Sequence, residues 1–367
     1  MAKVRLDDVA VEARETWNQD RKDVPVVGLE HLEPDEIWLR QWNVNPDENT
    51  FTKGFKKGQL LFGRRRAYQK KMSLASCDGI CSGDITVIAA RPEKIVPELL
   101  PFYLRTDAFF DFAMRGSGGS LSPRVKWSHI SDYEFDLPPM DEQKKLAELL
   151  WAANDLKESY KKAITATDEM LKAKFREMFG ENKQPTEAVG HVCSIIPGKS
   201  IPLSKENEGG NIAYVKVADF NFPGNERAIV SSPRHVSYET ASSSGIIPIN
   251  STLFAKNGAA ALSNKKRITR ISACIDMNTM AVFPIDDRIE ADYLFAFFEN
   301  LDLTQYVLIG AIPQYRPKEI MNIQIPLPPL ALQREFVAIA DKAESAKANL
   351  KKSIAAIDQV MKGLINQ

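Results

Sequence analysis

The chain has 367 residues, 44% of them hydrophobic, and its 48 basic residues balance its 48 acidic ones. This length predicts two domains with cores of their own. The absence of a signal-like N-terminus or an apolar run of ~18 residues predicts a cytoplasmic protein without a membrane partner. The four cysteines exclude a disulfide framework, and neither they nor the four scattered histidines have the spacing of metal ligands.

Residues 1–136 have the pattern of a globular α+β domain. Short β-branched and aromatic runs alternate with Gly, Pro, Asn and Ser, which predicts strands at 24–29, 59–63 and 84–90, while 97–114 is predicted to be helical. From Lys53 to Lys71 the chain has eight basic residues and no acidic one. Net charge therefore conceals a strongly basic segment on both sides of the strand at 59–63.

A long helix is predicted within 137–180, after the sequence LPP. Asp141 is a candidate N-cap and Gly180 a candidate C′ residue, with no Gly or Pro between them. Alternating spacings of four and three, typical of a coiled-coil seam, join Leu149, Ala153, Leu156, Tyr160, Ala163, Thr167 and Met170. A helix of about 38 residues would be roughly 57 Å long.

Residues 181–326 repeat the texture of the first globular part. Strands are predicted at 212–217, 251–256 and 280–285, and a helix at 290–300. The segment from Lys256 to Arg270 has five basic residues and no acidic one, and it again follows a strand. We therefore expect a second α+β domain at 181–326.

The final segment, 327–367, repeats the first long helix. Aligned without gaps, 137–172 and 327–362 share twelve of thirty-six residue types, against roughly two expected by chance. In the first copy these are Leu137, Pro138, Pro139, Gln143, Ala153, Lys157, Lys161, Lys162, Ile164, Ala166, Asp168 and Lys172. The matching seam is Ile339, Ala343, Ala346, Leu350, Ser353, Ile357 and Val360.

The repeat continues more faintly in the globular parts, where Val27, Leu29 and Phe62 correspond in order to Val215, Val217 and Phe254. We expect the two helices to pair antiparallel, related by a pseudo-twofold axis, between two globular α+β domains. The alternative is two separate surface helices, each lying on its own domain.

This arrangement resembles the specificity subunits of type I restriction-modification enzymes, over essentially the whole chain. The resemblance rests on FDLPPMDEQKKL at 135–146, IPLPPLALQREF at 325–336, the KGQLLFGR and NSTLFAK strands, and the GSGGSLSPR and GAIPQYRPK loops at 116–124 and 310–318. It implies two target-recognition domains that each recognise half of a split DNA sequence. The helices would be the spacer and the docking surface for two methyltransferase subunits, and restriction or translocase subunits could join them.

The docking residues implied by this resemblance are Pro138, Pro139, Gln143, Pro328, Pro329 and Gln333. The second copy has Ala331 and Leu332 where the first has Asp141 and Glu142. The second docking site is therefore expected to be contacted differently.

The residue types in both halves also suit DNA recognition on their own account. Duplex DNA requires cations for its phosphates and forked or amide side chains for its base edges. A single basic stretch is more commonly a solvated surface, but two clusters at matching places favour binding. The Gly-rich loop is equally consistent with an ordinary flexible connection. The predicted contacts are Lys56, Lys57, Arg64, Arg65, Arg66, Tyr68, Lys70, Lys71, Ser117, Gly118, Ser120, Arg124, Lys126, Lys256, Asn257, Lys265, Lys266, Arg267, Arg270, Gln314, Tyr315 and Arg316.

We expect no catalytic activity in this chain. It lacks the tetrapeptides of amino-methyltransferases, Gly-rich nucleotide motifs and a recognisable nuclease core. No cofactor is expected on the chain, and S-adenosylmethionine is expected on the partner methyltransferase subunits. The main alternative is a two-headed coiled-coil scaffold for proteins or peptides, with the LPP segments as polyproline ligands. Binding of DNA by any assembly distinguishes the two.

Overall fold

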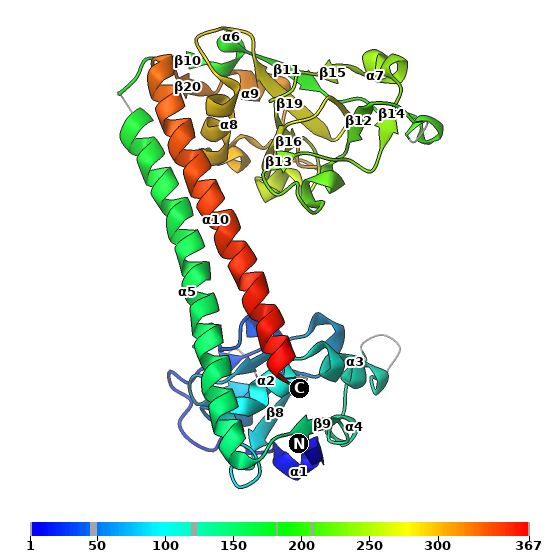
Figure 1. Ribbon diagram of the computed structural model, residues 1–367, viewed down its shortest axis with the longest axis vertical. Helices are drawn as coiled ribbons and strands as arrows, with labels where there is room; N and C mark the ends of the chain where they lie inside the picture. Colours follow the sequence, from blue (N-terminus) through cyan, green and yellow to red (C-terminus); the bar gives the residue numbers. More distant parts are fainter. Residues whose placement is uncertain (1, 45–49, 119–122, 181–182, 207–208, 366–367) are drawn as a thin grey trace. The chain divides into compact units, whose positions relative to one another are not determined.

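The structure, a computed structural model, describes residues 2–44, 50–118, 123–180, 183–206 and 209–365 (Figure 1). It divides into two compact units, Met1–Lys161 with Lys351–Gln367 and Lys162–Leu350. Both units combine strands and helices, which confirms the predicted α+β class. The division falls inside the two long helices, α5 (Met140–Phe179) and α10 (Leu330–Ile365), whereas the predicted domain boundaries lie at the helix ends. Each unit thus contains a segment of both helices.

Unit 1, as far as it is described, contains a two-stranded sheet β1-β9, a four-stranded sheet β2-β8-β5-β6 and a three-stranded sheet β3-β7-β4. The strands are β1 (Ala2–Arg5), β2 (Ala10–Ala13), β3 (Val26–Val27), β4 (Lys53–Phe55), β5 (Leu60–Gly63), β6 (Met72–Leu74), β7 (Gly79–Cys81), β8 (Ile85–Ala90) and β9 (Glu134–Leu137). The helical segments are α1 (Leu6–Val9), η1 (Leu29–His31), η3 (Ala67–Gln69), η4 (Pro97–Leu99), α2 (Leu100–Leu104), α3 (Asp107–Arg115) and α4 (Trp127–Ile130).

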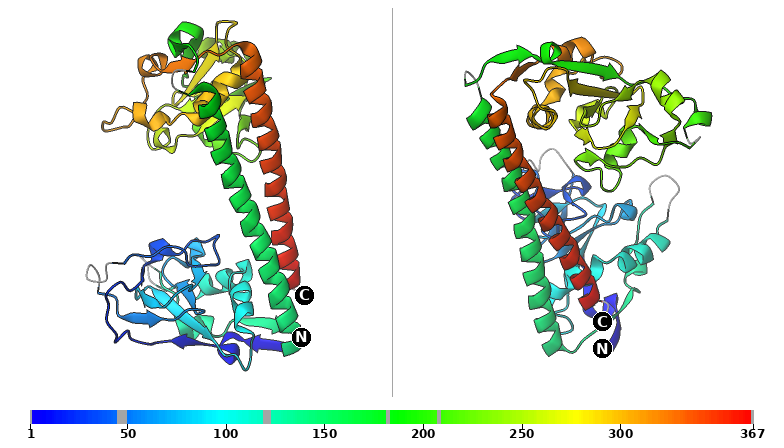
Figure 2. Two further views of the ribbon diagram at one scale, coloured as in Figure 1. Left: turned by 90° about the vertical axis from the view of Figure 1, so that its left-hand side faces the viewer. Right: turned by 45° about the horizontal axis from the view of Figure 1, so that its top comes forward.

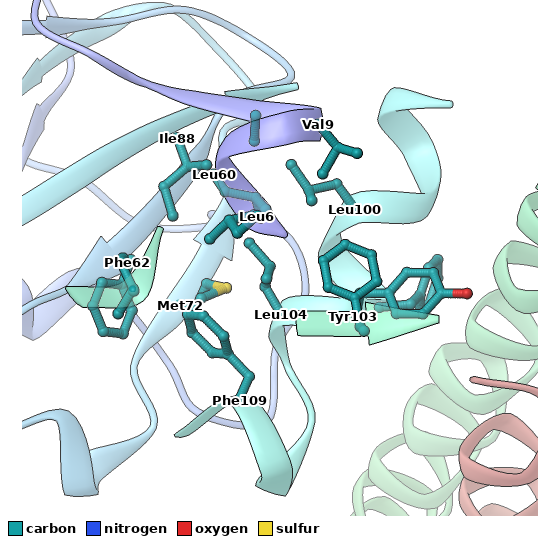
Figure 3. Packing of buried hydrophobic residues seen from close by; sticks show 14 of the residues in the cluster. Leu6, Val9, Leu60, Phe62, Met72, Ile88, Leu100, Tyr103, Leu104 and Phe109 are labelled. Carbon is teal, nitrogen blue, oxygen red and sulfur yellow. The ribbon is translucent and has the colours of Figure 1, made fainter. Parts of the chain in front are cut away.

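The four-stranded sheet of unit 1 is covered on both faces. Alternate residues of a strand point to opposite faces, so Leu60 and Phe62 of β5 enter one core cluster while Leu61 enters another. Burial on both faces explains why the central strand β5 is a continuous apolar run without an exposed polar side. In Figure 3, Leu60, Phe62, Met72 and Ile88 of the sheet pack with Leu6, Val9, Leu100, Tyr103, Leu104 and Phe109 from α1, α2 and α3.

Unit 2 contains, in its described residues, the sheets β10-β20, β11-β19-β16-β17-β13 and β14-β12-β18-β15. The strands are β10 (Thr186–Ala188), β11 (Cys193–Pro197), β12 (Ile212–Val215), β13 (Ala228–Ile229), β14 (His235–Val236), β15 (Ile246–Ile247), β16 (Thr252–Ala255), β17 (Lys266–Thr269), β18 (Ala273–Ile275), β19 (Thr279–Pro284) and β20 (Gln324–Pro326). The helical segments are α6 (Val189–Val192), η5 (Leu203–Lys205), η6 (Val217–Asn221), α7 (Tyr238–Ser244), η7 (Ala261–Ser263), α8 (Ala291–Asn300), η8 (Leu303–Tyr306) and α9 (Pro317–Met321).

The two units repeat one strand order. The sheet β2-β8-β5-β6 corresponds to β11-β19-β16-β17, and the parallel pair β3 and β7 corresponds to the parallel pair β12 and β18. Val27 and Phe62 therefore occupy the same strands as Val215 and Phe254, as predicted. Unit 2 adds β13, β14 and α7 to this shared frame.

Both long helices begin with the same buried glutamine contact. Gln143 is 3% exposed; its side-chain oxygen accepts a hydrogen bond from Val96 N at 2.9 Å, and its amide nitrogen donates to Pro138 O at 3.0 Å. Gln333 is fully buried and makes the same pair of bonds with Glu290 N and Pro328 O, at 3.0 and 2.9 Å. The glutamine thereby fixes the first helical turn against the globular part of its unit.

The candidate caps of the first long helix are partly confirmed. The helix α5 begins at Met140, so Asp141 lies in its first turn and not at the N-cap. An acidic side chain in the first turn is still favourable because it faces the positive end of the helix dipole. Gly180 directly follows the last helical residue, Phe179, as predicted.

Within each unit the segments of α5 and α10 run antiparallel, and both views of Figure 2 show them side by side. In unit 1, Lys157 and Asp358 form an ion pair at 2.7 Å, and the earlier residue Leu150 packs in the same core as the later residue Leu364. In unit 2, Asp168 pairs with Lys347, and further along α5 Phe175 contacts Phe336, with ring centroids 5.2 Å apart. Rising numbers on one helix thus meet falling numbers on the other.

The stripe predicted to face the partner helix is right on one side only in α5. Leu149, Leu156 and Met170 are 51%, 45% and 46% exposed. Ala153, Tyr160 and Thr167 of the predicted stripe lie on the covered side. They are joined there by Leu150, Asn154, Lys157, Lys161, Ile164, Asp168 and Leu171. Because Asn154, Lys157, Lys161 and Asp168 are polar, a search for apolar spacing does not find their positions.

In α10 the predicted stripe is right on one side only. Ala343, Leu350 and Ile357 lie on the covered side, whereas Ala346 and Val360 are exposed. The second covered row is Ala340, Lys347, Ile354 and Met361. No helix within the described ranges combines the length and apolar character needed to cross a membrane.

Replacing Gln143 or Gln333 by Leu should destabilise the corresponding unit. Each substitution leaves a buried backbone N–H and a buried carbonyl without their partner, which costs about 2–4 kcal/mol. The measurement is the free energy of unfolding from urea titrations. Gln359→Leu, on the exposed surface of α10, is the matched control, and an equal loss in all three variants would contradict this role.

Candidate nucleic-acid interface

In unit 1 the chain leaving β5 pairs with the loop that follows the glycine-rich segment. Arg65 and Arg124 form an isolated antiparallel bridge, and Gly118 bridges to the other side of Arg124. Val125 N donates to Arg64 O at 2.8 Å, and Arg66 N donates to Pro123 O at 3.2 Å. These backbone bonds fix the positions from which the two arginine side chains project.

Unit 2 repeats this pairing bond for bond. Asn257 and Gln314 form the isolated bridge, and Leu308 bridges to the other side of Gln314. Tyr315 N donates to Lys256 O at 2.9 Å, and Gly258 N donates to Pro313 O at 2.8 Å. The pairs Arg65/Asn257 and Arg124/Gln314 are therefore equivalent positions of the duplicated fold.

A carboxylate lies between the two arginines of unit 1. Arg124 Nε donates to Asp84 Oδ1 at 2.7 Å, and Arg65 Nη1 donates to Asp84 Oδ2 at 3.4 Å. Partial burial of Asp84 opposes its ionisation, but the hydrogen bonds and charges of Arg124 and Arg65 outweigh this and lower its pKa. The site thus holds an ionised carboxylate with two half-exposed guanidinium groups beside it.

The equivalent place in unit 2 holds uncharged amides. Backbone bonds establish the equivalence, because Arg64 N donates to Asp84 O at 3.0 Å and Lys256 N donates to Asn278 O at 2.6 Å. Asn257 Nδ2 contacts Asn278 Oδ1 at 3.3 Å. The side chains at these positions are charged in unit 1 and neutral in unit 2, although the backbone hydrogen bonds are the same.

Asp84 and Asn278 are not among the residues predicted from the sequence. Each residue sits in the turn before a core strand, β8 or β19, and carries no signal other than that position. Their role becomes visible only through the backbone bonds to Arg64 and Lys256. In unit 1 the depression at this place is lined by Arg64, Ser82, Gly83, Asp84 and Arg124.

Most of the remaining predicted DNA contacts lie on these two loop pairs or beside them. Arg66, Tyr68, Gly118, Lys126, Lys265, Arg270 and Arg316 are exposed, and Ser117, Lys70 and Lys256 are half-buried. Lys70 pairs with Asp107 at 2.6 Å. Arg270 lies beside the start of β16, at the other end of this strand from Asn257, where it donates to Asn250 Oδ1 and pairs with Asp292, both at 2.5 Å. Ser120 lies outside the described residues.

Some predicted contacts are incorrect because the side chains are buried or otherwise engaged. Tyr315 is 1% exposed, and its hydroxyl donates to Ala261 O at 2.9 Å. Lys266 is 6% exposed, and its Nζ donates to Leu301 O at 2.6 Å. Both residues alternate with surface positions, so their sequence neighbours, and not they, face solvent.

Four further residues are placed differently from the predicted basic clusters. Arg267 donates to Phe220 O through Nε and Nη2, at 3.2 and 2.8 Å, and Lys71 Nζ donates to Leu29 O at 2.7 Å. Lys56 and Lys57 are exposed, but they precede β5 whereas Arg64 and Arg65 follow it. Since the length of β5 separates the two pairs of residues, Lys56 and Lys57 lie at the opposite end of this strand from Arg64 and Arg65.

The implied docking residues divide in the same way in both copies. Gln143 and Gln333 bond to backbone inside their units, and Pro138 and Pro328 are buried. These four residues are internal, so the prediction that they contact a partner is corrected. Pro139 and Pro329 are exposed and remain predicted contacts. Within the described residues, no group of three His, Cys, Asp or Glu side chains could hold a metal ion.

The burial of Lys266 gives a pH test of its position. Burial lowers the pKa of Lys266 to about 8, although Asp302 and Glu299 attract its charge. Between pH 8 and the ordinary lysine value of about 10.5 the unfolded chain binds more protons, so stability rises with pH. Relative to Lys266→Met, the wild type should gain on the order of 2 kcal/mol across this window.

The measurement is urea unfolding of both proteins from pH 7.5 to 10.5. Lys265→Met is the matched control for loss of a lysine at an adjacent exposed position. Parallel pH profiles for Lys266→Met and the wild type would contradict the burial of this side chain.

Comparison with known proteins assigns a family to the second repeat. Residues 185–359 match the family model of the type I restriction modification DNA specificity domain. The chain is 28% identical over 92 residues to the EcoDI specificity subunit of a type I restriction enzyme from Escherichia coli. This match covers 25% of the chain and 20% of that protein, so the chain matches about a fifth of its curated relative's length.

Two solved structures share the fold over nearly the whole chain. One comes from a study of complex assembly and conformational transition of the type I R-M system, with 20% identity, a TM-score of 0.60 and coverage of 99% and 96% of the two chains. The other is the S subunit of a type I restriction-modification system from M. genitalium, with 13% identity, a TM-score of 0.56 and coverage of 100% and 95%. Residues 185–359 thus match the type I restriction modification DNA specificity domain, and the duplicated fold of the chain is similar to that of a solved S subunit of a type I restriction-modification system.

Proposed function

We propose that this chain is the DNA sequence-specificity component of a type I restriction-modification complex, with one target-recognition domain in each unit. The observation that carries the proposal is the repeated loop pair. It presents Arg65 with Arg124 in one unit and Asn257 with Gln314 in the other, on the same backbone bridge. Arginine and side-chain amides are the groups best suited to base edges.

Exposed cations beside each loop pair would supply the phosphate contacts. Arg66 and Lys126 flank the pair in unit 1, and Lys265 and Arg316 flank the pair in unit 2. Phosphate contacts position a protein on duplex DNA, whereas base contacts select the sequence. Two such sites on one chain support recognition of a target in two parts, separated by an unread spacer.

The methylation chemistry would come from partner subunits. We propose that the chain is non-catalytic, that it carries no cofactor, and that S-adenosylmethionine binds to two methyltransferase subunits. The exposed residues Pro139 and Pro329 at the starts of α5 and α10 are proposed docking points. Beside Pro139 the acidic residues Asp141 and Glu142 are exposed, and Ala331 and Leu332 replace them in the second copy. The two docking points would therefore differ in charge.

Neutralising Arg66 and Lys126 together should weaken DNA binding and reduce its salt dependence. Each lost phosphate contact lowers the slope of log K against log salt by about 0.9, so the double alanine variant should lose nearly 2. The measurement is fluorescence anisotropy of labelled duplex DNA with the free chain and with the chain co-purified with methyltransferase subunits.

Lys56→Ala with Lys57→Ala is the charge-matched control, because these residues lie at the other end of β5. Absence of DNA binding in every assembly would sink the proposal. If the same assemblies captured proteins or peptides, that outcome would favour the scaffold alternative.

Lengthening both long helices by one heptad should change the spacer and leave both half-sites intact. Seven helical residues add about 10.5 Å, which corresponds to about three base pairs of duplex. The insertions belong after Lys161 and after Ser353, so that the antiparallel ion pairs on both sides are kept. Selection of bound sequences from a random duplex pool gives the preferred spacer. Altered half-sites would contradict a spacer role for the helices.

A further inference from the structure

The equivalent loop pairs of the two units carry different base-reading chemistry. Arg65, Arg124 and Asp84 of unit 1 stand where Asn257, Gln314 and Asn278 stand in unit 2. We infer that unit 1 recognises a guanine and unit 2 an adenine in its half of the DNA target. This inference rests on the proposed function and names the bases that the two sites select.

The base assignments follow from hydrogen-bond patterns in the major groove. Guanine presents two acceptors, N7 and O6, which match the two parallel N–H groups of an arginine fork. Adenine presents one acceptor, N7, and one donor, the N6 amine, which match the donor and acceptor of an Asn or Gln amide. A guanidinium has no acceptor, so it cannot complete the adenine pattern.

The unit 1 geometry leaves the arginine fork suitably placed. The hydrogen bond from Arg124 to Asp84 uses Nε, and the Arg124 side chain is 49% exposed. In the described part of the chain no hydrogen bond joins the terminal nitrogens of Arg124 to protein. Its fork can therefore meet a ligand while Asp84 holds the inner edge. Asp84 is thus a positioning residue.

Two observations favour base edges over phosphates at this position. The Asp84 carboxylate is ionised beside both arginines and would repel a phosphate, whereas base acceptors are uncharged. In unit 2 the equivalent amides of Asn257 and Gln314 are neutral and could not replace a charge-neutralising contact. A role shared by both units must therefore be hydrogen bonding to uncharged groups. On duplex DNA these groups are the base edges, whose donors and acceptors differ from one base to another.

The unit 2 amides have the freedom that this role needs. Asn257 Nδ2 makes only long contacts, at 3.3 and 3.4 Å, with Asn278 Oδ1 and Met277 O. In the residues that the structure describes, Gln314 is bonded to Leu308 through its backbone and not through its side-chain amide. Both amides can offer an acceptor and a donor to one adenine edge or to two adjacent bases.

The experiment uses the full chain, free and co-purified with methyltransferase subunits, to select bound duplexes from a random pool. The wild type should enrich a two-part motif with a guanine in one half and an adenine in the other. Arg124→Gln should reduce the guanine preference about tenfold to a hundredfold, in that half only. Gln314→Arg should change only the other half, towards guanine.

Three further variants separate base contacts from phosphate contacts and from misfolding. Arg124→Lys keeps the charge but loses the fork, so the salt dependence should remain while the guanine preference falls. Asp84→Asn should also weaken the guanine preference and should strengthen non-specific binding, because a negative charge is removed. Lys56→Gln, at the other end of β5, loses the same charge as Arg124→Gln and should leave the motif unchanged.

Each result separates this inference from the proposed function. A two-part motif that Arg124→Gln and Arg124→Lys leave unaltered, with uniformly weaker binding, would overturn the base assignment and leave the specificity role standing. Changes by Arg124→Gln and Gln314→Arg in the same half would overturn the assignment of units to halves. Failure of every assembly to bind DNA would overturn both.

Discussion

The structure depends on apolar packing between each globular part and the ends of both long helices. The core of unit 1 includes Leu150 from α5 and Met361 and Leu364 from α10. Phe175 from α5 and Phe336 from α10 occupy the corresponding core in unit 2. Each core is therefore completed by segments far apart in the chain, and burial of such side chains is worth about 1.5–3 kcal/mol each. Neither globular part would keep this apolar surface covered without both helices.

Polar contacts between the helices determine which way the helices run. Lys157 pairs with Asp358 in unit 1, and the repeat-related residues Lys347 and Asp168 pair in unit 2. In a parallel, in-register pairing Lys157 would face Lys347 and Asp168 would face Asp358, so like charges would meet. Partly exposed ion pairs add little net stability. Like charges placed opposite each other would nevertheless destabilise the parallel arrangement. These pairs select the antiparallel arrangement, while the apolar ends supply most of the stability.

The paired loops show how one frame can carry two specificities. Backbone bonds, such as those of Val125 and Tyr315 to the residues after β5 and β16, hold the loops irrespective of the side chains that face outwards. The exposed residue Arg124 and the half-buried residue Gln314 can then differ without a cost in folding, because they contribute little to the core. Recognition chemistry can therefore change at the surface while the duplicated core is retained.

The sequence alone determined the duplication, the α+β class, the two long helices and the family resemblance, because these follow from residue periodicity and from matching residue types. It also located the basic segments after β5 and β16. Only the tertiary structure showed that Gln143 and Gln333 are internal, that Tyr315 and Lys266 are buried, and that polar residues face the partner helix. It also placed Asp84 beside Arg124. These facts depend on which side of an element is covered and on contacts between distant segments, and local sequence patterns do not specify either.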